Sequence, residues 1–205
     1  LGLGAGPGLD ALSPWQVAGL PERLPPGVYR FAQAMPATAA TQAALGWTMG
    51  ALRPATAASR PLAPTPRLVA PQGADIDAVG REARACAFAR DLINRPANAL
   101  GPAELADAVR EVGEAHGAEC RIIVGEALLA ANYPLVHAVG RAASRAPRLI
   151  DLRWGDERHP KVTLVGKGVC FDSGGLDIKP SSGMALMKKD MGGAAVALGL
   201  ARVLM

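Results

Sequence analysis

Residues 165–180 read VGKGVCFDSGGLDIKP, and this stretch sets both the class of fold and the chemistry expected of the chain. It continues an apolar run, Val162–Val165, that predicts a buried strand. Residues 187–195, MKKDMGGAA, then open the last predicted helix. Charged side chains among glycines at the ends of buried strands are where the sites of α/β sheets collect. The sequence therefore predicts a functional site in these two stretches.

Apolar periodicity predicts three longer helices around this site. The first spans residues 76–93 and is ended by the Asn94-Arg95-Pro96 sequence, because the residue before a proline disfavours helical backbone. The second has Pro102 in its first turn and is followed by Gly117. The third covers residues 191–205, and its nearly continuous apolar composition predicts burial on most sides.

Short apolar and β-branched runs predict strands between the second and third helices, with a small helix at Glu126–Ala131. The four runs are Arg121–Val124, Leu135–Val139, Leu149–Trp154 and Val162–Val165. Helices followed by several strands and another helix indicate an α/β fold with a sheet of mixed strand direction.

The first 74 residues have a different character. Eleven of the 17 prolines precede Asp75, and their density from Pro54 to Pro71 predicts an extended linker. Shorter helices are expected around Pro14–Leu20 and Thr38–Thr48. The uncharged stretch Phe31–Leu52 contains proline, glycine and polar residues, so it is unsuited to cross a membrane.

Composition excludes several classes of protein. The chain has 205 residues, of which 50% are apolar and 4% aromatic, so it is neither a disordered tail nor a collagen-like or disulfide-rich scaffold. Its net charge of +4 is unclustered and far from a nucleic-acid-binding signature. The cysteines, Cys86, Cys120 and Cys170, form no C-x-x-C motif, which excludes zinc fingers and favours a reducing compartment.

Two kinds of site, glycine-rich phosphate-binding loops and histidine zinc sites, are disfavoured by the spacing of their residues. A phosphate-binding loop would need glycine at Lys161 and serine or threonine at Gly168. The run of glycines from Gly2 to Gly8 is not a dinucleotide fingerprint, because Pro7 replaces its last glycine. A zinc site of histidines is disfavoured because no ligand spacing relates the three, which are His116, His137 and His159.

A carboxylate-rich metal site is the third possibility. Asp172 and Asp190 could bind hard divalent cations, with Lys167 as a neutral amine ligand. Lys179 would stay protonated and stabilise negative charge on a substrate oxygen. The alternative is that both aspartates cap turns or a helix N-terminus. Spacing alone leaves both interpretations open.

The two stretches resemble the leucyl (cytosol) aminopeptidase family. The spacing Lys-x4-Asp-x6-Lys-x10-Asp, from Lys167 to Asp190, is specific to it. Other segments are similar to the family's catalytic domain (Arg90–Pro96, Val139–Arg141, Leu149–Trp154) or to its N-terminal domain (Leu45–Trp47). The resemblance implies the remnant of a smaller α/β domain plus the proline-rich linker in 1–74. It implies the N-terminal half of a mixed-sheet α/β peptidase catalytic domain in 75–205.

The resemblance also implies a function. The family's enzymes use two divalent cations, Mn²⁺ or Zn²⁺, to hold a water or hydroxide that attacks the first peptide carbonyl of a substrate with a free N-terminus. Asp172 would bridge both cations, while Lys167 and Asp190 would bind one of them. Lys179 would stabilise the oxyanion, and Met187 would line the pocket for the first side chain. A cytoplasmic homohexamer is implied as well.

One family motif is absent from the sequence. The Asp-x-Glu-x-Arg motif, which supplies further carboxylate ligands and an arginine, does not occur in these 205 residues. We therefore expect a fragment of a longer protein that is inactive and poorly folded by itself.

The alternative function is that of a non-catalytic or DNA-binding member of the same fold. It would use the arginines of one strip, which are Arg141, Arg145, Arg148, Arg153 and Arg158. Acidic residues are interleaved with these arginines, which favours a solvated face of mixed charge. Neither nucleic acid nor a membrane is expected as a partner.

Overall fold

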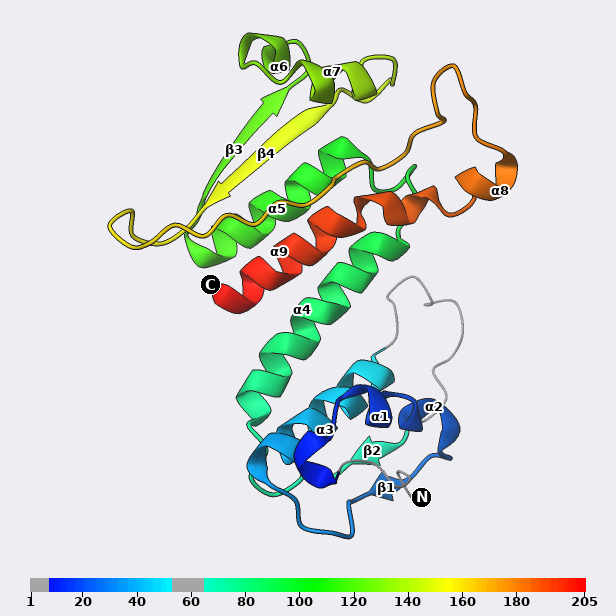
Figure 1. Cartoon of the computed structure of the whole chain (residues 1–205), viewed down its shortest axis with the longest axis vertical. Coiled ribbons are helices and arrows are strands. Elements are labelled where there is room, and N and C mark those ends of the chain that lie inside the picture. The colour runs from blue at the N-terminus through cyan, green and yellow to red at the C-terminus, as the bar shows by residue number, and fades with distance from the viewer. Residues whose placement is uncertain (1–7, 53–64) are drawn as a thin grey trace. The chain divides into compact units, whose positions relative to one another are not determined.

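The computed structural model describes residues 8–52 and 65–205 (Figure 1). The chain divides into two compact units, one ending at Phe88 and the other beginning at Ala89. Most of the predicted linker, residues 53–64, lies outside the described residues, as does most of the run of glycines near the start. The domain boundary expected between residues 74 and 75 stays a prediction.

Small helices and a two-stranded parallel sheet build the first unit. Its elements are η1 (Leu9–Ala11), α1 (Trp15–Ala18), α2 (Leu20–Arg23), β1 (Val28–Tyr29), α3 (Ala37–Ala51), β2 (Arg67–Leu68) and the first part of α4 (Ile76–Asn94). Val17 of α1 and Trp47 of α3 are buried in one cluster, and the Tyr29 ring lies 6.0 Å from the Trp47 ring. The helix expected at 14–20 is two short helices, and the one expected at 38–48 is confirmed as α3.

After the last residues of α4, the second unit continues with α5 (Pro102–His116). This helix packs on an antiparallel pair of strands, β3 (Glu119–Val124) and β4 (Arg148–Arg153). Cys120 pairs with Leu152 and Ile122 with Ile150 in this sheet. The ends of α5 follow the sequence: Pro102 occupies its first turn, and Gly117 ends it at a φ of 66°, in the left-handed region that favours glycine. The predicted strands at 121–124 and 149–154 are therefore confirmed to within two residues.

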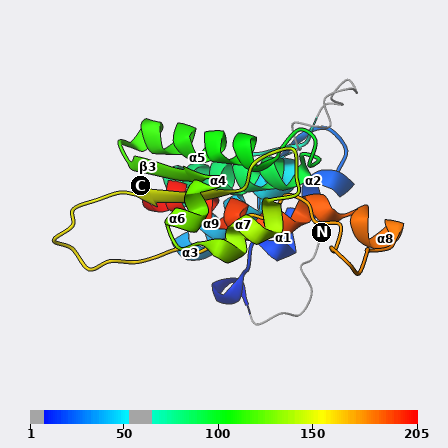
Figure 2. The same ribbon diagram turned by 90° about the horizontal axis from the view of Figure 1, so that it is seen from above.

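Two predicted strands are wrong. Leu135–Val139 lies inside a helix, α7 (Pro134–Gly140), which follows α6 (Ala127–Ala130). A short apolar run does not distinguish strand from helix, and Pro134 at the first helical position favours the helix. Val162–Val165 forms no strand, since no described segment pairs with it, and 78% of Val162 and 89% of Val165 is exposed. The loop directly after β4 projects away from the helices of the unit, and the chain then returns to approach Gly193 at Gly166 (Figure 2).

The C-terminal part of this unit consists of α8 (Ser181–Met184), the 3₁₀ helix η3 (Met187–Met191) and α9 (Gly192–Leu204). The helix expected at 191–205 is confirmed, but its burial on most sides is not. Leu198 is buried, whereas Val196, Leu200 and Leu204 are about half exposed. Among the described residues, no helix is both long enough and apolar enough to span a membrane.

Candidate metal and substrate site

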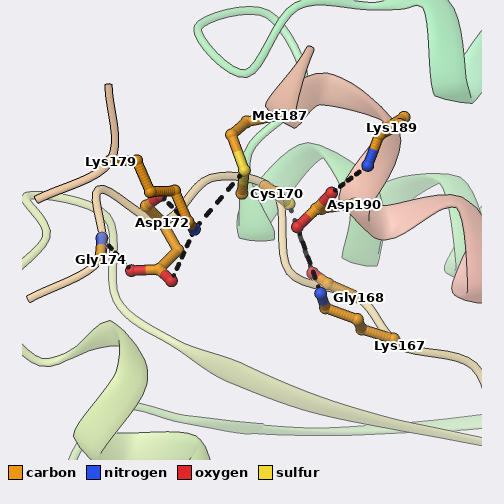
Figure 3. A network of polar contacts seen from close by, with 9 residues as sticks. All are labelled: Lys167, Gly168, Cys170, Asp172, Gly174, Lys179, Met187, Lys189 and Asp190. Atoms are coloured by element: carbon orange, nitrogen blue, oxygen red, sulfur yellow. Dashed lines mark hydrogen bonds and ion pairs between the residues drawn. The ribbon is translucent and has the colours of Figure 1, made fainter. Parts of the chain in front are cut away.

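A tight loop joins Asp172 to Lys179. The Gly174 amide donates to Asp172 Oδ1 at 2.9 Å, and the Lys179 amide donates to the Ser173 carbonyl at 2.9 Å. Gly174 has a φ of 105°, a backbone conformation that side chains disfavour, so glycine is required at this turn. The loop therefore fixes the Asp172 carboxylate and returns the chain to Lys179 (Figure 3).

Lys179 closes the loop a second time through its side chain. Its Nζ donates to the Asp172 carbonyl at 2.9 Å and to Asp172 Oδ2 at 3.0 Å, and it lies 3.6 Å from Met187 Sδ. The bond from the Gly174 amide and the Lys179 ammonium hold the pKa of Asp172 below its usual value. Three residues predicted for the site, Asp172, Lys179 and Met187, are thus brought together.

The remaining two predicted residues, Lys167 and Asp190, contact each other. Lys167 Nζ lies 3.2 Å from Asp190 Oδ2, and Lys189 Nζ lies 2.9 Å from Oδ1, so an ammonium group contacts each carboxylate oxygen. Hydrogen bonds from Lys189 and then Lys167 lower the pKa of Asp190. Lys167 also lowers the pKa of Asp172 through its charge. Figure 3 shows the two pairs in the same part of the unit.

The capping alternatives for the two aspartates have different outcomes. Met191, not Asp190, is the N-cap residue of α9, and no side chain caps this helix. Asp190 is therefore available to other groups. Asp172 does cap a turn, through Gly174, but its second oxygen faces Lys179. A turn-capping role and a ligand role are compatible for a carboxylate with two oxygens.

Gly166 and Gly193 position Lys167 relative to Asp190, a role that the sequence interpretation missed. The Ala194 amide of α9 donates to the Lys167 carbonyl at 2.9 Å. A Cβ at Gly166 would overlap the Gly193 carbonyl, and one at Gly193 would lie 2.9 Å from the Lys167 amide nitrogen. The two backbones can only approach this closely because both positions are glycine.

The donor atoms suit a divalent cation as part of a larger ligand set. Carboxylate oxygens are hard ligands, which Mn²⁺, Mg²⁺ and Zn²⁺ all accept. Within the part of the chain that the structure describes, no three His, Cys, Asp or Glu residues form a group that could hold a metal ion. Asp172 and Asp190 would supply two carboxylates to such a set, with the Lys167 amine as a third donor.

Other candidate residues have structural partners. Arg153 pairs with Asp151 at 2.8 Å and Arg158 pairs with Asp156, in line with a face of mixed charge. Arg145 bonds to Glu104 Oε2 at 3.1 Å and to the Asn98 carbonyl at 2.9 Å, so it ties its loop to the start of α5. His137 lies 3.0 Å from Glu126.

Comparison with known proteins identifies relatives of this chain. Residues 87–205 match the catalytic domain of the cytosol aminopeptidase family. A probable cytosol aminopeptidase of Rhodococcus opacus is 36% identical over 95% of this chain and 42% of its own length.

Two solved structures are similar as well. The crystal structure of the cytosol aminopeptidase from Coxiella burnetii superimposes with a TM-score of 0.84 at 45% identity, over 97% of this chain and 43% of that one. The bottromycin maturation enzyme BotP, in complex with Mn, gives a TM-score of 0.74 at 30% identity, over 93% of this chain and 43% of that one. The chain thus spans less than half the length of these relatives. From the match over 87–205, the chain belongs to the cytosol aminopeptidase family.

Proposed function

We propose that this chain carries part of the active site of a metal-dependent aminopeptidase of the leucyl aminopeptidase type. The observation that carries the proposal is that the four charged residues of the family's motif form two ion pairs in the same part of the unit (Figure 3). Lys167 contacts Asp190, Asp172 contacts Lys179, and the charge of Lys167 acts on Asp172. The substrates would be peptides with a free N-terminus, and the protein would be a cytoplasmic homohexamer.

Asp172, Asp190 and Lys167 would hold the cations. Asp172 is assigned to both of two ions, and Lys167 and Asp190 to one of them. When bound, divalent cations lower the pKa of water and polarise a carbonyl group. Manganese is supported by the manganese complex of BotP, an enzyme that is similar to 93% of this chain. Zinc is the alternative, because the same donors accept it.

Lys179 and Met187 would act on the substrate. The Lys179 ammonium lies 3.0 Å from Asp172 Oδ2, and this position next to a proposed metal ligand supports a role at the substrate oxygen on which negative charge would develop. It would donate a hydrogen bond to that oxygen and thereby stabilise it. The Met187 side chain contacts Lys179 and offers a polarisable apolar surface for the first side chain of the peptide.

Binding of Mn²⁺ tests the assigned ligands. We expect the 205-residue chain to remove Mn²⁺ from solution, measured as loss of the electron paramagnetic resonance signal of the free ion. Asp172→Asn and Asp190→Asn should each weaken binding at least tenfold. Asp177→Asn, which changes an unassigned carboxylate of the same loop, should not. No binding by the wild-type chain, or equal loss in all three variants, would contradict the ligand assignment.

The activity is tested by extending the reading frame. If the source DNA encodes an Asp-x-Glu-x-Arg motif beyond the codon for Met205, the longer polypeptide should hydrolyse leucine p-nitroanilide in the presence of Mn²⁺. Lys179→Ala should lower kcat more than it changes Mn²⁺ affinity, because Lys179 is assigned to the substrate. A longer polypeptide that carries the motif, binds Mn²⁺ and releases no p-nitroaniline would contradict the proposed activity.

A further inference from the structure

Lys189 is a third ammonium group at the site, and none of the roles above uses it. It follows Lys188 in η3 and directly precedes Asp190, one of the proposed metal ligands. We propose that Lys189 lowers the affinity of this site for divalent cations and so raises the cation concentration at which the site fills. This inference rests on the proposed function.

The geometry places the Lys189 charge next to the cation position. Its Nζ lies 2.9 Å from Asp190 Oδ1, whereas Lys167 approaches Oδ2 of the same carboxylate. Figure 3 shows Asp190 between these two lysines. A cation held by both Lys167 and Asp190 would lie on the Oδ2 side of the carboxylate. The Lys189 ammonium would then remain on the other oxygen, one carboxylate group away from the metal.

The sum of the charges at the site determines how strongly it attracts a cation. Asp172 and Asp190 carry two negative charges, and three ammonium groups contact them, those of Lys167, Lys179 and Lys189. The five side chains therefore sum to one positive charge. Without Lys189 they would sum to zero, which repels a divalent cation less.

Lys189 has two opposing effects on cation affinity. Their relative sizes decide whether the affinity rises or falls when the charge of Lys189 is removed. Lys189 restrains the Asp190 carboxylate, but its side chain is 66% exposed, and ion pairs at such positions contribute little. Repulsion between one positive charge and a doubly charged ion a few ångströms away is larger, even in water. Removing the charge should therefore tighten cation binding, by about fivefold at low ionic strength.

Lys188 offers a matched control in the neighbouring position. Its Nζ contacts the Asn94 carbonyl at 3.4 Å, at the end of α4, and not a carboxylate of the site. A change from lysine to methionine removes the same charge and similar volume at either position. Any effect that is specific to Lys189 therefore reports its contact with Asp190.

The experiment measures Mn²⁺ affinity by the resonance of the free ion, with the 205-residue wild-type chain and three variants. We expect Lys189→Met to lower the Kd about fivefold at 20 mM salt and less than twofold at 500 mM salt. Lys188→Met should stay within twofold of the wild type. Lys189→Arg keeps the charge and should retain the wild-type Kd. Circular dichroism verifies that each variant is folded.

The outcomes separate this inference from the proposed function. Mn²⁺ binding by the wild type with an unchanged or higher Kd in Lys189→Met overturns the inference and leaves the metal site standing. An equal decrease in Kd for Lys188→Met also overturns it, because general surface charge would then explain the effect. No binding by any of the four proteins overturns the metal site and this inference with it.

Discussion

Lys179 Nζ is bonded to Asp172 twice, at 2.9 Å to its carbonyl oxygen and at 3.0 Å to Oδ2. The loop between these residues is therefore closed by a side chain as well as by the backbone bond from Lys179 to Ser173. A single ammonium group thus holds both the position of a proposed metal ligand and the shape of the loop that presents it.

The loop should loosen when this ammonium is removed. In Lys179→Met the carboxylate keeps only its bond from the Gly174 amide, so we expect that amide to exchange its proton about three to ten times faster. Hydrogen exchange followed by mass spectrometry of the loop peptide measures this. Lys161→Met, which changes an exposed lysine outside the loop, is the control. Equal protection in both variants would show that the backbone alone holds the loop.

The contact between Gly166 and Gly193 should be intolerant of a methyl group. A Cβ at Gly193 would lie 2.9 Å from the Lys167 nitrogen, and separating the two backbones would also move Lys167 away from Asp190. We expect Gly193→Ala to reduce the free energy of unfolding by about 1–3 kcal/mol, measured by denaturant titration. Gly192→Ala is the matched control, because its Cβ would approach nothing closer than 3.7 Å. Equal stability of the two variants would contradict the proposed constraint.

Acid should destabilise the site through its two aspartates. The pKa values of Asp172 and Asp190 are lowered in the folded chain, so the unfolded chain binds more protons as the pH falls through about 4. Their stabilising contribution is present above that pH and is lost below it. The Tm of the wild type should therefore fall more steeply between about pH 5 and pH 3 than that of Asp172→Asn/Asp190→Asn. Parallel curves for the two proteins would refute this assignment.

The thiol of Cys170 should be unreactive in the folded chain. Burial raises its pKa to about 11, so about one thiol in a thousand is ionised at pH 8. With Cys86→Ser and Cys120→Ser in place, reaction with Ellman's reagent should be slow in buffer and fast in denaturant. Because the folded pKa lies above the unfolded one, stability should also decrease as the pH rises from about 9 towards 11. Fast reaction in buffer would show that this segment opens readily.

The sequence predicted those parts of the fold whose signals are local. The helix ending at Asn94 and the one between Pro102 and Gly117 have apolar periodicity and end signals in their own residues, and both are confirmed. Val162–Val165 has the composition of a strand, but a strand also requires a neighbour for its backbone bonds. No described segment provides one, which residue composition alone cannot reveal.

The same distinction applies to the site. The spacing from Lys167 to Asp190 selected residues that the structure brings together in pairs. It did not reveal which lysine contacts which carboxylate, because that depends on how α9 packs against the segment around Gly166. The sequence does not separate Lys189 from its neighbour Lys188, and only the contact with Asp190 distinguishes the two. The glycine pairs flanking both stretches were the available signal for that close packing.

The 205-residue chain should bind cations without catalysing peptide hydrolysis. It offers two carboxylates and one lysine as ligands, and the sequence contains no Asp-x-Glu-x-Arg motif to complete two metal sites. With Mn²⁺ at saturation, we expect no release of p-nitroaniline from leucine p-nitroanilide above the level of a Lys179→Ala control. Activity in the wild-type chain that Lys179→Ala abolishes would contradict this prediction. It would mean that Asp172, Asp190 and Lys167 suffice as metal ligands for catalysis, so that the remaining family ligands improve a centre that already functions.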